Sequence, residues 1–70
     1  MGMKKNLLEA KMKLFGDNQS SLAEVLDISI QTLNRKLNGT DGAQFNLTEL
    51  RKITERYNLT PEGFYEIFLA

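Results

Sequence analysis

The sequence predicts an all-α fold, a compact arrangement of five short helices in a single domain that spans residues 1–70. Apolar residues recur at intervals of three and four, which is the period of an amphipathic helix. Asn, Ser or Thr precedes most of the periodic segments, and these residues cap helix N-termini. A chain of this length buries about 60% of its unfolded surface, enough for one small core. The predicted helices span residues 4–15, 19–26, 30–38, 47–57 and 61–68.

The composition is typical of a globular protein and excludes several functional classes. Hydrophobic residues make up 41% of the chain and charged residues 26%, which argues against disorder. The chain has no cysteine and no histidine, which excludes disulfides, thiolate or imidazole metal sites, and Cys–His or Ser–His catalysis. Glu62 and Glu66, four residues apart, are typical of a solvated helix face. We therefore expect no enzyme activity, no metal and no cofactor.

The apolar segments are too short for a membrane-spanning protein. No apolar run approaches the ~20 residues that a membrane-spanning helix needs. Glu9, Lys11 and Lys13 interrupt the first apolar segment, so it lacks the continuous apolar centre of a secretory signal. We expect a cytoplasmic protein that does not bind membranes.

The charges are balanced in sum but uneven along the chain. The net charge is zero, which is unfavourable for a nucleic-acid-binding protein because phosphate contacts dominate affinity. Residues 1–36 carry six basic and four acidic residues, whereas residues 37–70 carry three basic and five acidic residues. This distribution allows one end of the molecule to face DNA and the other to face a partner subunit.

The first predicted helix, residues 4–15, has an apolar stripe surrounded by lysines. The apolar residues are Leu7, Leu8, Met12 and Phe15. The lysines are Lys4, Lys5, Lys11 and Lys13. They form either an ordinary solvated face or a flank that contacts phosphate.

Two short helices joined by a tight turn follow, and the second divides its residues between core and solvent. Asn18 and Ser29 are suited to cap the two N-termini, and Gly39 lies where a helix C-terminus favours a left-handed residue. Leu33 and Leu37, four apart, are predicted to face inward. The residues predicted to face outward are Gln31, Asn34, Arg35 and Lys36. Gln, Asn and Arg are side chains that read base edges in a major groove.

This region carries a resemblance to a known family. The pattern consists of Gln19, Leu22–Ala23, an apolar Ile28 at the turn, Ser29, Leu33 and Asn38–Gly39. It resembles the lambda-repressor-like helix-turn-helix family of the XRE or Cro/repressor type, in which a small residue such as Ala23 lies where two helices cross closely. Residues 47–68 also fit the family's fourth and fifth helices, so the resemblance covers most of the chain. The family often pairs an Arg near Met12 with an acid near Leu37, and this chain has apolar residues at both positions.

The resemblance implies sequence-specific binding of double-stranded DNA, with the helix at 30–38 in the major groove. The family's base-reading positions fall on Gln31, Arg35 and Ile30. Gln31 suits a bidentate contact with adenine and Arg35 one with guanine, while Ile30 either contacts a thymine methyl group or closes the core edge. The DNA-backbone candidates are Gln19, Ser29, Thr32, Asn34, Lys36, Asn38, Thr40 and Gln44. Among them, Lys36 is either phosphate-bound or solvent-exposed.

The chain between the third and fourth helices is predicted to be a loop over residues 39–44, because it contains two glycines and an aspartate. We expect Asp41 to point away from DNA, since its carboxylate would repel phosphate. Phe45 is then predicted to anchor the returning chain in the core.

The last two helices carry clear start signals. Asn46 and Glu49 form a capping box, and Thr60 followed by Pro61 is a typical cap and first position. In the helix at 47–57 the predicted inward positions are Leu47, Leu50, Ile53 and Tyr57. The predicted outward positions are Arg51, Lys52 and Arg56.

The final helix, residues 61–68, has more apolar surface than a short helix buries within a monomer. The residues are Phe64, Tyr65, Ile67, Phe68 and Leu69. Either they complete the small core, or Tyr65 and Leu69 form a two-fold contact in a homodimer. Such a dimer would place its two recognition helices one DNA turn apart, ~34 Å, on a pseudo-palindromic operator.

Two functions remain for this fold. The first is a small transcriptional regulator, similar to phage repressors and Cro, that binds double-stranded DNA. The alternative is a protein–protein interaction module on the same scaffold, of antitoxin or anti-repressor type, which uses the apolar helix at 61–68.

Overall fold

The computed structural model describes residues 3–70 and has the all-α, five-helix architecture predicted from the sequence. Its helices are α1 (Lys5–Leu14), α2 (Gln19–Leu26), α3 (Ile30–Asn38), α4 (Leu47–Arg56) and α5 (Pro61–Phe68), with a 3₁₀ turn, η1 (Thr40–Gly42), between α3 and α4. No β-strand occurs within this range. The helices α1 and α4 are one or two residues shorter than predicted, and η1 occupies part of the predicted loop.

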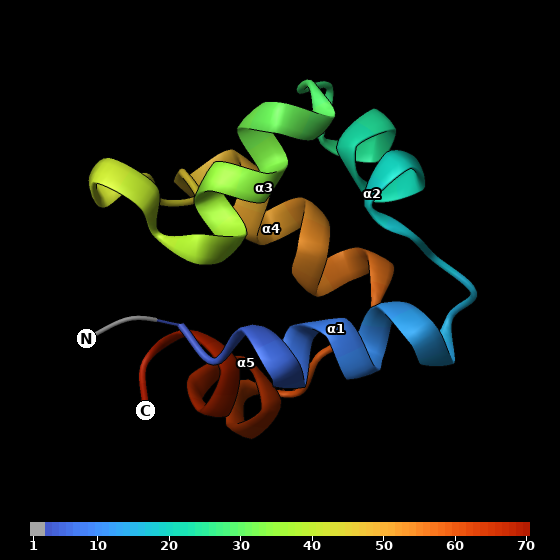
Figure 1. Ribbon diagram of the computed structural model, residues 1–70. Coiled ribbons are helices and arrows are strands. Elements are labelled where there is room, and N and C mark those ends of the chain that lie inside the picture. Colours follow the sequence, from blue (N-terminus) through green and yellow to red (C-terminus); the bar gives the residue numbers. More distant parts are fainter. Residues whose placement is uncertain (1–2) are drawn as a thin grey trace.

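The helix α4 lies at the centre of the molecule (Figure 1). The pair α2 and α3 packs on one side of it, and α1 and α5 lie on the other side. The backbone N–H of Lys4 donates to the carbonyl of Ile67 at 2.7 Å, which joins the start of α1 to the end of α5.

Local capping determines where four of the helices begin. The side chains of Asn18, Ser29, Asn46 and Thr60 each accept a hydrogen bond from the backbone N–H three residues later, at 2.8–3.1 Å. These caps satisfy N–H groups that have no partner within the helix. All four predicted N-caps are confirmed, and so is the left-handed C-terminal residue Gly39, whose φ is 65°.

The core contains the predicted inward residues of most helices. It is formed by Leu8, Met12, Leu22, Ala23, Leu26, Leu33, Leu37, Ile53, Tyr57 and Ile67. Met12 and Leu37 are both buried here, so the apolar residues in place of the family's ion pair are part of the core. The prediction for Leu47 is wrong, because this first residue of α4 is 73% exposed. Phe45 is half-buried against the core, as predicted.

A partly buried polar cluster connects the turn between α1 and α2 to the end of α4. The Asp17 carboxylate accepts two hydrogen bonds of 2.6 Å from Arg56, one of 2.7 Å from the Tyr57 hydroxyl and one of 2.9 Å from Ser21. The Asp17 side chain is only 3% exposed. The hydrogen bonds from Arg56 hold the pKa of Asp17 well below its usual range. Arg56 is exposed, as predicted, and its guanidinium group also pairs with Asp17, which the sequence did not indicate.

Candidate nucleic-acid interface

The base-reading candidates lie on the outer surface of α3. Gln31 and Arg35 are four residues apart, so they share one helix face, and both are exposed. Ile30, the first residue of α3, is 46% exposed. Its exposure leaves an apolar contact surface beside Gln31 at the N-terminal end of the helix. On the opposite side, Leu33 and Leu37 are buried as predicted.

The turn that enters α3 is fixed by local structure on both sides. Asp27 ends α2 in a left-handed conformation with φ of 58°. Ser29 then accepts the Thr32 N–H at 3.1 Å, and its hydroxyl donates to the Thr32 hydroxyl at 2.9 Å. Ser29 is exposed and Thr32 half-buried, so these two backbone candidates lie together at the N-terminus of α3. The rigid turn holds α3 at a fixed angle to α2.

Four side chains form a continuous hydrogen-bonded chain from α2 across α3 to α1. The amide of Asn34 donates to Gln19 at 3.3 Å, and the amide of Asn38 donates to Asn34 at 3.0 Å. The ammonium group of Lys5 donates to Asn38 at 2.7 Å. Three predicted backbone candidates are thus brought together, and a cation from α1 joins them. We call this set, Gln19, Asn34, Asn38 and Lys5, the polar chain.

Lys5 is the residue of this surface that the sequence did not single out. The pattern of α1 gave four equivalent lysines, either solvated or near phosphate. Only the tertiary structure shows that Lys5 lies against the C-terminal end of α3. Its hydrogen-bond partner, Asn38, is neutral, so this contact places no acid against the Lys5 ammonium group.

Lys36 has a different environment from the two alternatives that its position in α3 suggested. Its ammonium group lies 2.6 and 2.8 Å from the two carboxylate oxygens of Glu49 in α4, and its side chain is 16% exposed. Glu49 also accepts the backbone N–H of Asn46 at 2.9 Å, so it completes the capping box and holds Lys36 at once. The ammonium group of Lys36 therefore forms an ion pair between α3 and α4.

The turn after α3 carries the remaining backbone candidates and one acidic residue. Thr40 and Gln44 are both exposed, within or just after η1. Asp41 is exposed, and its Oδ2 lies 3.7 Å from Nη2 of Arg35. A carboxylate thus stands beside the predicted guanine-reading side chain.

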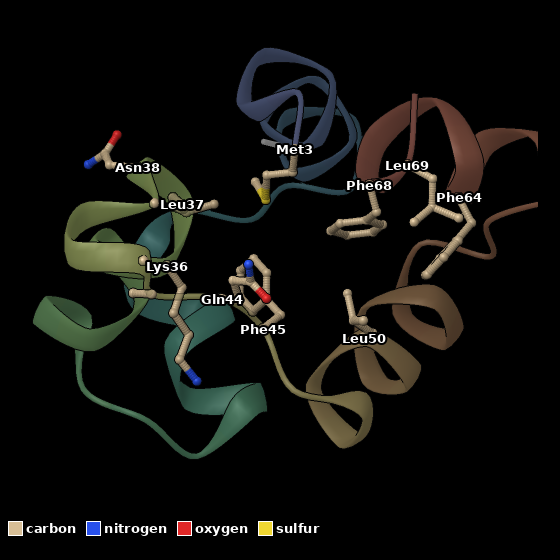
Figure 2. A pocket seen from close by; sticks show the side chains of 13 residues that line it. Met3, Lys36, Leu37, Asn38, Gln44, Phe45, Leu50, Phe64, Phe68 and Leu69 are labelled. Carbon is tan, nitrogen blue, oxygen red and sulfur yellow. The ribbon is translucent and has the colours of Figure 1, made fainter. Parts of the chain in front are cut away.

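The predicted dimer-contact residues lie on the exposed side of α5. Tyr65 is 56% and Leu69 53% exposed, whereas Ile67 is buried in the core. Leu69 also lines a pocket of about 470 Å³ between α3, η1, α4 and α5. Figure 2 shows Phe45, Phe68 and Leu50 grouped around this pocket, with Asn38, which also lines it, set apart from these three side chains.

Two negative findings apply to residues 3–70, the part of the chain that the structure describes. Within it, no group of three or more acidic residues is arranged to hold a metal ion. No helix in the same range is long and apolar enough to cross a membrane.

Comparison with known proteins gave one match. A family model described as BetR domain matches residues 5–67, from the first residue of α1 to the next-to-last residue of α5. Searches among curated proteins and among solved structures gave no match. The family match therefore covers all five helices and the surface described above.

Proposed function

The chain belongs to the BetR domain family, a group of small helical domains of helix-turn-helix type, and on this premise we propose that it is a sequence-specific DNA-binding regulator. The observation that carries the proposal is the division of α3, with Leu33 and Leu37 buried and with Gln31 and Arg35 exposed on one face. A capped helix with this polar face, held at a fixed angle by the preceding turn, suits insertion into a major groove. The finer assignment to the XRE or Cro/repressor type rests on the sequence pattern.

In this proposal α3 reads bases through three residues. Arg35 donates two hydrogen bonds to the O6 and N7 atoms of guanine, and Gln31 pairs with N6 and N7 of adenine. Ile30 is exposed at the start of α3, which favours contact with a thymine methyl group over a purely structural role.

The DNA backbone is contacted around this helix. The polar chain presents the amides of Gln19, Asn34 and Asn38 beside the cation of Lys5, and these groups together suit a row of phosphates. The other proposed backbone contacts are Ser29, Thr32, Lys36, Thr40 and Gln44. Lys36 contributes least among them, because Glu49 already holds its ammonium group.

We further propose that the protein acts as a homodimer in the cytoplasm. The dimer forms through α5, where Tyr65 and Leu69 remain exposed after the core is complete. Two copies of α3 would then contact a pseudo-palindromic operator on one face of the duplex. Dimerisation also offsets the weak electrostatic attraction of a chain with zero net charge.

A binding selection tests this proposal. The purified protein is incubated with a pool of random duplexes at ~50–100 mM salt, where phosphate contacts are still strong. Its mass in solution is measured in parallel. Enrichment of a two-fold symmetric site by a dimeric protein supports the proposal. A folded protein that enriches no sequence contradicts it.

One observation favours the alternative function, a protein–protein interaction module. The pocket of about 470 Å³ has eight apolar side chains along its walls, the exposed Leu69 among them, so α5 and the pocket together offer an apolar contact surface. Salt separates the two functions. DNA binding weakens steeply as salt rises, whereas an apolar protein interface does not.

A further inference from the structure

The outer surface of α3 presents one cation that no buried acid holds. Of the two basic residues in α3, Lys36 is bound by both oxygens of Glu49. The guanidinium group of Arg35 is 59% exposed, and its nearest acid is Asp41, with Nη2 and Oδ2 separated by 3.7 Å. This distance is longer than a hydrogen bond, so the pair is an open electrostatic contact. No hydrogen bond to an acid holds the Arg35 side chain, but the nearby carboxylate of Asp41 attracts it.

The backbone fixes the position of Asp41. Its φ is 53°, in the left-handed region, and Gly39 and Gly42 on either side have φ of 65° and 76°. The N–H of Gly42 donates to the carbonyl of Gly39 at 3.2 Å, and the N–H of Ala43 to that of Thr40 at 2.9 Å. Three left-handed residues in four turn the chain sharply just after α3. Asp is one of the few residues with a side chain that adopt this conformation readily.

Arginine can bind a base and a carboxylate together. Its guanidinium group has five N–H donors in one plane, and a bidentate contact with guanine uses two of them. The other three N–H donors of Arg35 remain available to Asp41. A contact with Asp41 would then hold the guanidinium group in an orientation that faces the groove. By contrast, an arginine that turns outward to a phosphate leaves the Asp41 carboxylate unpaired beside the negatively charged backbone.

We propose that Asp41 determines specificity in DNA recognition by orienting Arg35 toward a guanine edge and by opposing sequence-independent contacts with phosphate. This inference rests on the proposed DNA-binding function. It explains why an acidic residue stands at the end of a recognition helix, where it lowers overall attraction to DNA. Asp41 lowers the affinity for DNA of non-target sequence more than the affinity for the target site. A repulsive group creates selectivity in this way.

The test compares two duplexes of equal length and base composition, the selected site and a scrambled version. Dissociation constants are measured across a salt series for the wild type, Asp41→Asn, Arg35→Ala and the double variant. Asn retains the size and the left-handed preference of Asp, so Asp41→Asn is expected to fold like the wild type. Thermal unfolding of each variant verifies this. Glu55→Gln, an exposed residue of α4, is the control for losing one negative charge.

Asp41→Asn is expected to raise affinity for the scrambled duplex about three- to tenfold, with little gain for the selected site. The ratio between the two affinities falls accordingly. Glu55→Gln should change both affinities by the same small factor. In the Arg35→Ala background, Asp41→Asn should no longer change the ratio, because Asp41 acts through Arg35.

Two results overturn the inference and leave DNA recognition intact. In the first, Asp41→Asn changes the affinities for the selected and the scrambled duplex by the same factor. In the second, Asp41→Asn changes the ratio of the two affinities equally in the presence of Arg35 and in the Arg35→Ala background. Failure of the proposed function looks different, because the wild type itself would then bind the two duplexes equally.

Discussion

Arg56 donates two hydrogen bonds of 2.6 Å to the carboxylate of Asp17, which lies 39 residues earlier in the chain. The Tyr57 hydroxyl donates a third, at 2.7 Å. These contacts fasten the turn before α2 to the end of α4. Because α2 packs against α3, the proposed recognition helix, the cluster supports the scaffold of the proposed interface without taking part in it.

Replacement of Asp17 by Asn should destabilise the protein by about 2–4 kcal/mol, since a nearly buried carboxylate with four donors is removed. Chemical denaturation measures the loss. Asp27→Asn is the matched control, because Asp27 is exposed and at the end of a helix, and it should change stability by less than about 0.5 kcal/mol. Similar losses in the two variants would contradict the role assigned to the cluster.

The same carboxylate should make stability depend on acidity. The pKa of Asp17 is lowered in the folded state, first by its hydrogen bonds from Arg56, while the unfolded value is about 3.9. The folded state therefore binds fewer protons in acid, so the contribution is complete above about pH 5 and is lost as the pH falls. Denaturation midpoints measured from pH 7 to 2.5 should decline less steeply for Asp17→Asn than for the wild type. Parallel curves would refute this.

A second pH effect is expected in alkali. Burial raises the pKa of Tyr57, and its hydrogen bond to Asp17 raises it further. Ionisation of an unfolded tyrosine begins near pH 10, so the folded state loses stability as the pH rises beyond about 10. Absorbance of tyrosinate during an alkaline titration should show Tyr57 ionising only on unfolding. Ionisation of Tyr57 in the folded protein would disagree with its buried position.

The contact between Lys36 and Glu49 should act as a pair. Glu49→Gln leaves the ammonium group of Lys36 without its charged partner and is expected to cost about 1–3 kcal/mol. Adding Lys36→Met should recover part of that loss, because the unpaired charge is removed while the aliphatic stem is kept. A double-mutant cycle on denaturation free energies measures the coupling. Strict additivity would show that the two residues act independently.

The exposed side of α5 should be responsible for dimer formation. Leu69→Glu places a charge in the proposed contact and is expected to give a folded monomer that binds the operator weakly. Sedimentation equilibrium gives the mass, and circular dichroism gives the fold. Leu47→Glu is the control, because Leu47 is also exposed but lies at the start of α4. If both variants stay dimeric, α5 is not the contact.

The helix boundaries were predictable because they depend on residues near each other in sequence. Asn18, Ser29 and Asn46 cap through groups three residues away, and Gly39 ends α3 by its own conformation. The inward prediction for Leu47 is wrong because its spacing fits an apolar stripe, yet this first residue of α4 is exposed while Glu49, two residues later, is buried. Periodicity identifies a helix face but does not show how far the neighbouring helices extend.

The pairings of charged residues could not be predicted in the same way. Arg56 with Asp17, Lys36 with Glu49, and Lys5 with Asn38 join residues 39, 13 and 33 positions apart. Each pairing depends on how two helices are placed in space, and one sequence contains no signal for it. The base-reading positions of α3 came from the resemblance and the polar pattern, and they remain predictions.

The most direct test of the central claim is the base preference of the Arg35→Ala variant. Wild type and variant are each incubated with the same pool of random duplexes, and the enriched sequences are compared. The proposal predicts that the variant binds the wild-type site about 1–3 kcal/mol more weakly and loses its preference at one guanine position, while the rest of the site is retained. An unchanged site and affinity would show that α3 does not read DNA through Arg35.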